Sequence, residues 1–171
     1  MRCRTAAIGL ALTVMLALPA VQGSALHRRQ DVATLPGYFQ YSATELGRYE
    51  TSLKLRMNAV KQAAERLGDY GDTTAWIAHR EADGLAEIHE EWMDLMFVQS
   101  GEALLRVGGT IDEPYLESPG ELRGPRVTGG TTRRIGAGDV VNVPAGMQHQ
   151  FLISPGSQIT FFTMKIRSRR R

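Results

Sequence analysis

The sequence is poor in two features that would narrow the class of protein at once. It has a single cysteine in 171 residues, Cys3, so the chain can form no internal disulfide and its fold cannot depend on cross-links. Its longest apolar run, residues 8–18, is much shorter than the roughly 20 residues that a helix needs to cross a bilayer. These shortages exclude a disulfide scaffold and a stable membrane span, and they leave the stability of the fold to a core, a metal or self-association.

The first 25 residues have the order of a secretory signal peptide. Two arginines precede the apolar run, and a proline and several small residues follow it. The alternatives are a buried helix or a membrane anchor, and the run is too short for an anchor. We therefore expect residues 1–25 to be a signal peptide that is cut after Gly23 or Ala25, and the protein to be secreted or periplasmic.

Positive charge is concentrated at the two ends of the chain. The formal net charge is +2, yet residues 30–166 contain 12 basic and 18 acidic side chains. Residues 167–171 form a basic tail with four arginines. Because the body of the chain is not basic, the sequence does not indicate nucleic-acid binding.

A helix is predicted in the N-terminal part, after a polar linker or arm at residues 26–41. Ser42 and Glu45 have the spacing of a capping box, and apolar residues then recur at steps of three and four. The pattern predicts a helix over residues 43–67 within an N-terminal segment 42–72. Two pairs are spaced for ion pairs on its surface: Glu50 with Lys54, and Lys61 with Glu65.

From Thr73 the apolar pattern becomes that of short strands. Runs rich in branched residues alternate with turns that contain glycine, aspartate and serine, apart from an irregular stretch at residues 109–124. Many short strands without helices between them are typical of an antiparallel sandwich or barrel. The sequence therefore predicts an all-β domain over residues 73–166 with one N-terminal α-helix.

Four side chains are candidates for a metal site in this domain. Glu87 and His89 lie two apart on one predicted strand and share a face, a turn can bring Asp94 beside them, and His149 lies on a late strand. Two imidazoles with one or two carboxylates suit iron, manganese or zinc. The alternative is a pair of core histidines that are neutralised by acids. Spacing alone leaves both open.

The segment around His149 resembles the second motif of the cupin superfamily. That motif runs glycine, five residues, Pro-x-Gly, two residues, histidine, three residues, asparagine. Gly138, Pro144, Gly146 and His149 match at the right spacing, while Ile153 replaces the asparagine. The resemblance implies that the Pro-Ala-Gly turn directs His149 into a barrel.

The segment around His89 resembles the first cupin motif in part. His89 matches its second histidine, Asp94 its acid and Gly101 its closing glycine. Glu87 stands where the first histidine is usual, and Ala82 replaces the first glycine. The resemblance covers about residues 73–166. It implies a cupin-type barrel, or double-stranded β-helix, in which Glu87, His89, Asp94 and His149 bind one divalent metal ion.

A carboxylate in place of a neutral imidazole favours iron(II) or manganese over copper. The resemblance is compatible with a metal-dependent oxygenase, lyase or isomerase that acts on a small molecule. It is also compatible with a module that binds a small ligand without turnover, or with a structural or storage protein. Arg123 is a candidate partner for an anionic substrate, and His79 is a reserve ligand. A homodimer is a further expectation.

Overall fold

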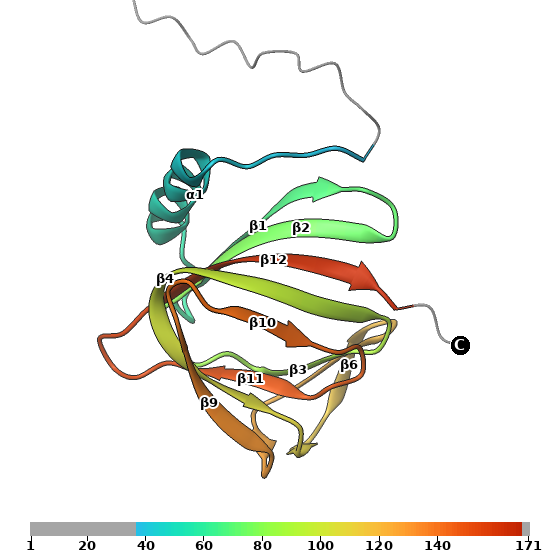
Figure 1. Cartoon of the computed structure of the whole chain (residues 1–171). Helices are drawn as coiled ribbons and strands as arrows, with labels where there is room; N and C mark the ends of the chain where they lie inside the picture. The colour runs from blue at the N-terminus through green and yellow to red at the C-terminus, as the bar shows by residue number, and fades with distance from the viewer. Residues whose placement is uncertain (1–36, 169–171) are drawn as a thin grey trace, which may run out of the picture. The chain divides into compact units, whose positions relative to one another are not determined.

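The computed structural model describes residues 37–168. The predicted signal peptide at residues 1–25, most of the predicted linker at residues 26–41 and the last three arginines lie outside the described residues. Contacts divide the chain after Tyr38, and the fold below belongs to the unit that begins at Phe39. This unit has one helix, α1, and an antiparallel sheet that curls around a core (Figure 1). The predicted all-β architecture with an N-terminal helix is confirmed. No helix of the described part is long and apolar enough to cross a membrane.

Helix α1 (Ala43–Leu55) begins at the predicted capping box. The Ser42 side chain accepts a hydrogen bond from the Glu45 amide, and the Glu45 carboxylate accepts one from the Ser42 amide. Lys54 pairs with Glu50 across 2.7 Å, as their spacing predicts. Leu53 is fully buried against the sheet, so the helix is attached by its last turn.

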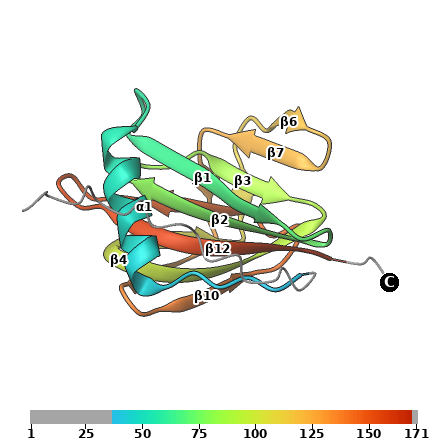
Figure 2. The same cartoon turned by 90° about the horizontal axis from the view of Figure 1, so that it is seen from above.

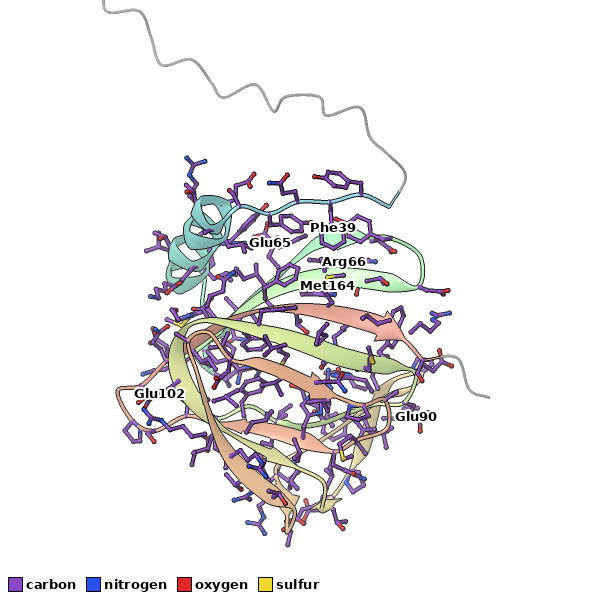
Figure 3. The ribbon with its side chains drawn as sticks, viewed as in Figure 1. Phe39, Glu65, Arg66, Glu90, Glu102 and Met164 are labelled. Atoms are coloured by element: carbon purple, nitrogen blue, oxygen red, sulfur yellow. The ribbon has the colours of Figure 1, made fainter. Side chains whose placement is uncertain are left out.

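The prediction that this helix reaches residue 67 is wrong. The helix ends at Leu55 with Arg56 as its C-cap. The Asn58 side chain then accepts hydrogen bonds from the amides of Val60 and Gln62, and Lys61 has a positive φ of 54°, so the chain turns away from the helical course. The chain continues as strand β1 (Gln62–Asp69), which pairs antiparallel with β2. Glu65 therefore lies on a strand beside the helix (Figure 3). It pairs with Arg56, not with Lys61. The sheet thus starts about ten residues earlier than position 73.

The remaining strands follow the predicted runs closely. The large sheet has the order β1-β2-β12-β4-β11-β3-β7-β6, and β9 and β10 also pair with β4 (Figures 1 and 2). All its pairings are antiparallel, and a small separate sheet joins β5 to β8. The strands are β2 (Thr73–Arg80), β3 (Ala86–His89), β4 (Trp92–Val107), β5 (Thr110–Ile111), β6 (Tyr115–Ser118), β7 (Glu121–Gly124), β8 (Val127–Thr128), β9 (Thr131–Gly136), β10 (Val140–Val143), β11 (His149–Leu152) and β12 (Ile159–Arg167).

Strand β4 joins two runs that the sequence separated at a Ser-Gly turn. Its first half pairs with β12 and β10, and its second half pairs with β11 and β9. Gly101 lies between the halves with a φ of +73°, and a Cβ there would lie 1.9 Å from the carbonyl oxygen of Gln158. Only glycine fits that conformation and that approach, so Gly101 allows one strand to serve both sides of the curled sheet.

The stretch at residues 109–124 is not irregular. It contains β5 and the hairpin of β6 and β7, and β7 pairs with β3 along its length. The core lies between the two sides of the sheet, where Phe151 and Phe161 stack with ring centroids 4.7 Å apart. Its other buried members are residues of the facing strands and of the turn after β11: Ala78, Met96, Val98, Ala103, Leu105, Ile135, Val143, Ile153 and Ile159.

Candidate metal centre

Three adjacent strands place the candidate residues in two rows. His149 on β11 is paired with Glu87 on β3, and Glu87 is paired in turn with Arg123 on β7. One row further, His89 on β3 is paired with Glu121 on β7. Paired residues on neighbouring strands have their side chains on the same face, so these pairings direct both histidines and both glutamates to one side of the sheet.

The fourth candidate comes from the facing strands. Asp94 on β4 is paired with Lys165 on β12, and Lys165 Nζ lies 2.9 Å from Asp94 Oδ1. The other carboxylate oxygen, Oδ2, lies 3.3 Å from His89 Nε2 and 3.7 Å from His149 Nε2. The structure therefore brings together all four residues that the sequence singled out.

The Pro-Ala-Gly turn positions the two histidines relative to each other. The Gly146 amide donates a hydrogen bond to the carbonyl of His89, and the Met147 amide donates one to the carbonyl of Pro144. Gly146 has a φ of +76°, which closes the turn. His149 then enters β11 with its ring centroid 5.2 Å from that of His89. The turn of the second motif is thus hydrogen-bonded to the strand of the first motif.

Glu87, His89 and His149 each offer a ligand atom, and these three atoms lie within 4.8 Å of one another. Glu87 Oε2 is 3.4 Å from His89 Nε2 and 4.0 Å from His149 Nε2. The two histidines are almost fully buried. His89 Nε2 is buried without a hydrogen-bond partner, although two carboxylates lie close to it. A buried imidazole nitrogen in that situation is the arrangement that a metal ion completes.

Glu121 is a member of the site that the sequence did not reveal. Its carboxylate contacts His89 Nδ1, and this contact directs the Nε2 atom toward Glu87, Asp94 and His149. A carboxylate on the outer nitrogen fixes the tautomer and orientation of a metal-binding histidine. Because Glu121 lies in the stretch that seemed irregular, only its pairing with β3 places it here.

Charges around the carboxylates keep them ionised. Burial alone would raise the pKa of Glu87, but the contact with His89 and the positive charge of Arg80 hold that pKa well below its usual range. Burial also opposes ionisation of Asp94, yet His89 and Lys165 lower its pKa to about 2. Both carboxylates are therefore available as anionic ligands at neutral pH.

The two histidines differ in protonation when no metal is bound. Burial disfavours the charged form of His89, but its contacts with Asp94, Glu121 and Glu87 raise its pKa to about 10. Burial lowers the pKa of His149, which keeps that ring neutral. His149 is thus ready to bind a metal, whereas His89 must first release a proton.

His79 is not part of this centre. It is fully buried and its ring nitrogens contact Thr160 Oγ1 at 2.8 Å and Glu81 Oε1 at 3.2 Å. These partners satisfy the ring, so His79 is an ordinary strand histidine. Arg123, the candidate substrate partner, lies at the centre on strand β7, and its Nη1 is 3.2 Å from Glu87 Oε2.

The centre forms part of the wall of a cavity with a volume of about 1160 Å³. Its lining includes all four candidate residues, the arginines Arg80 and Arg123, and apolar side chains of β2, β4 and β12. A concave, largely apolar space with a few convergent polar groups is the usual form of a small-molecule site.

The sequence matches no protein-family model and no curated protein. Solved structures do share its fold. One is an uncharacterised conserved protein with a double-stranded β-helix domain from Klebsiella pneumoniae, at 15% identity and a TM-score of 0.51, covering 78% of this chain and 99% of that one. Another is a cupin-2 domain from Rhodospirillum rubrum, at 14% identity and a TM-score of 0.46, covering 65% and 63% of the two chains.

The strand order, the curled antiparallel sheet and the likeness to a double-stranded β-helix protein define the class: this chain has the cupin fold. At these identities the likeness concerns the fold alone. The resemblance that the two motifs imply is thereby confirmed for the architecture, while the chemistry depends on the residues of this chain.

Proposed function

We propose that this chain is an exported cupin that binds one divalent metal ion and acts on a small molecule, in the manner of an oxygenase, lyase or isomerase. One observation carries the proposal. The ligand atoms of Glu87, His89 and His149 converge within 4.8 Å at a cavity wall, and the buried His89 Nε2 has no hydrogen-bond partner. A metal held by two imidazoles and a carboxylate leaves positions at which a substrate or dioxygen can bind.

The residues around the ligands would supply the remaining chemistry. His89 and His149 hold the ion, and Glu87 or Asp94 completes the ligand set. The carboxylate that does not bind the ion stays beside it as a proton acceptor, because both are ionised at neutral pH. Two imidazoles with carboxylate oxygen suit iron, manganese or zinc.

A non-catalytic module that binds a small ligand is the second candidate. The metal-free cluster already neutralises its own charges, since Arg80 contacts Glu87 at 3.0 Å and Lys165 contacts Asp94 at 2.9 Å. A cluster of this kind can persist as a polar part of a binding cavity without any ion.

Metal content decides between these candidates. Residues 26–171 are purified without a histidine tag and dialysed against iron(II) under anaerobic conditions, manganese or zinc, and elemental analysis then measures the metal per chain. We expect about one ion for the wild type and a loss of most of it in His149→Ala, because two remaining ligands hold a labile ion poorly. Well under one ion per wild-type chain with every metal would contradict the metal centre.

Matched variants separate ligands from neighbours. His79→Asn, which can keep the hydrogen bond to Thr160, should leave the metal content unchanged. Glu87→Gln and Asp94→Asn should differ in metal content, since only replacement of the carboxylate that binds the ion lowers it. We also propose that the chain forms a homodimer, and light scattering of the same preparations tests this.

A further inference from the structure

The cavity is large, and several arginines line it. Pockets that hold drug-sized ligands usually have volumes of about 300–1,000 Å³, and this one reaches about 1160 Å³. Its lining contains six arginine and lysine side chains and five carboxylates. Two of the arginines, Arg66 and Arg126, pair with Asp69 and Asp112 outside this lining, so the other four basic side chains face five carboxylates. A divalent ion at the centre would make the balance of charge positive. The cavity therefore suits an anion that is considerably bigger than acetate.

One wall changes from polar to apolar within a single step along the strands. Paired positions on β4, β12 and β2 form a polar row of Asp94, Lys165 and Thr74. The next row toward the interior consists of Met96, Thr163 and Trp76, of which Met96 and Trp76 are apolar and Thr163 has a buried hydroxyl without a hydrogen-bond partner. Two residues along a strand span about 6.6 Å, so an apolar surface begins roughly one ring's width from the metal centre. A ligand that extends along this wall needs an apolar body.

Arg123 adds a positively charged donor at the polar end. Its Nε contacts Glu117 at 3.0 Å and its Nη2 lies 3.5 Å from Glu121. Its Nη1 is buried and has no hydrogen-bond partner, although it lies 3.2 Å from Glu87 Oε2. That same oxygen belongs to the group that can hold a metal. Once the ion takes this oxygen, Nη1 remains a charged donor directly beside the ion.

Arg80 is not equivalent to Arg123. Its Nη1 donates to Gln62 across 2.7 Å and its Nη2 to Glu87 across 3.0 Å, while its guanidinium lies over the ring of Phe151. These contacts occupy both terminal nitrogens of Arg80 and hold Glu87 in place, although Arg80 Nε is also buried without a hydrogen-bond partner. Arg123 differs in that its terminal Nη1 lacks a hydrogen-bond partner and lies beside Glu87 Oε2, so we take Arg123 as the residue that distinguishes an anionic ligand from a neutral one.

We infer that the site takes an amphipathic small-molecule anion, with a carboxylate beside the metal and Arg123 and with a ring-sized apolar body along Met96 and Trp76. The inference deepens the proposed function and rests on it, because the carboxylate is placed beside the metal-binding group. It excludes small hydrophilic acids and neutral sugars as good ligands.

The two tryptophans of the chain provide the readout. Trp76 and Trp92 both line the cavity, and the sequence contains no others. A ligand along the apolar wall should change the tryptophan fluorescence directly, and calorimetry gives the affinity independently.

The test compares three probes on the manganese-loaded protein: 4-phenylbutanoate, its neutral amide 4-phenylbutanamide, and acetate. We expect the acid to bind at least about tenfold more tightly than the amide, and acetate to leave the fluorescence unchanged at the same concentrations. Arg123→Gln should weaken the acid about tenfold and spare the amide, and Arg123→Lys should recover part of the loss. Trp76→Leu should weaken acid and amide alike.

Arg134→Gln is the matched control. Arg134 is an exposed arginine on β9 that pairs with Glu102 outside the cavity, and its replacement should change neither affinity. Equal binding of acid and amide by the wild type would overturn the inference, and this comparison needs no variant to fold.

The same measurements separate this inference from the metal centre. If the protein holds a metal but binds acid and amide equally, the proposed function stands and the preference for an amphipathic anion is contradicted. If the protein holds no metal but still prefers the acid, and this preference depends on Arg123, the metal-dependent activity is contradicted and the anion site stands.

Discussion

At the residue scale, the site depends on the different surroundings of two histidines. His149 is kept neutral by burial, whereas His89 is surrounded by Asp94, Glu121 and Glu87, which raise its pKa to about 10 in the metal-free protein. A proton and a metal therefore compete for His89 over the whole physiological pH range. The carboxylates contribute no protons to this competition, because they are already ionised.

We predict that metal binding releases about one proton per ion near pH 7, and that it comes from His89. The apparent affinity should therefore rise about tenfold per pH unit between pH 6 and 8, and lose strength steadily as the pH falls. Calorimetric titration in buffers of different ionisation enthalpy measures the proton count. Release of no proton near pH 7 would show that His89 is neutral before binding, or that it is not a ligand.

The same histidine affects the stability of the metal-free protein in the opposite direction. Its folded pKa of about 10 lies above the usual value of 6.5. Its contribution to the free energy of unfolding is therefore fully present below about pH 6.5, and it is lost as the pH rises through about 10. Alkaline conditions thus favour metal binding and weaken the empty site.

At the scale of elements, strand β4 and its central glycine connect the two sides of the sheet. The first half of β4 carries Asp94, and the second half pairs with β11, the strand of His149. The bend at Gly101 therefore determines how the strand of one ligand candidate meets the strand of another. A change at Gly101 should disturb both the fold and the site.

We predict that Gly101→Ala lowers the free energy of unfolding by more than about 3 kcal/mol. The positive φ costs about 1–2 kcal/mol for any residue with a Cβ, and the Cβ would meet the backbone carbonyl of Gln158, which cannot move freely. Denaturant unfolding measures the change. Gly156→Ala is the control, since Gly156 has a φ of +80° but open space around it, and it should cost only about 1–2 kcal/mol. Equal losses in the two variants would show that the close approach to Gln158 is unimportant.

At the scale of the whole molecule, export is a prediction that the described residues do not address. It depends on the charged, apolar and small-residue order of residues 1–25. We expect the exported protein to begin near Ser24 or Leu26, because the small residues there suit the cleavage site. N-terminal sequencing of protein recovered from outside the cytoplasm checks this, and an intact Met1 on that material would contradict it.

Local patterns were enough for the class of fold, the capping box and the four central residues. Alternation and turn spacing depend on neighbouring residues, and the second motif contains its own turn, so His149 was visible from a short segment. The end of the helix was not, because Val60, Ala64 and Leu67 continue the helical apolar period, although Val60 and Ala64 are exposed in the structure and Leu67 lies on β1. The side chain of Asn58 and the pairing with β2 decide it for the strand.

The sequence by itself determined the all-β architecture, the shared face of Glu87 and His89 and the turn before His149, because each depends on residues close together in the chain. The tertiary structure alone decided the partners of those residues. Glu121 reaches His89, Lys165 reaches Asp94 and Arg123 reaches Glu87 through pairings between strands that are 32, 71 and 36 positions apart. Local propensity carries no information about such registers, since they are set when the whole sheet closes around its core.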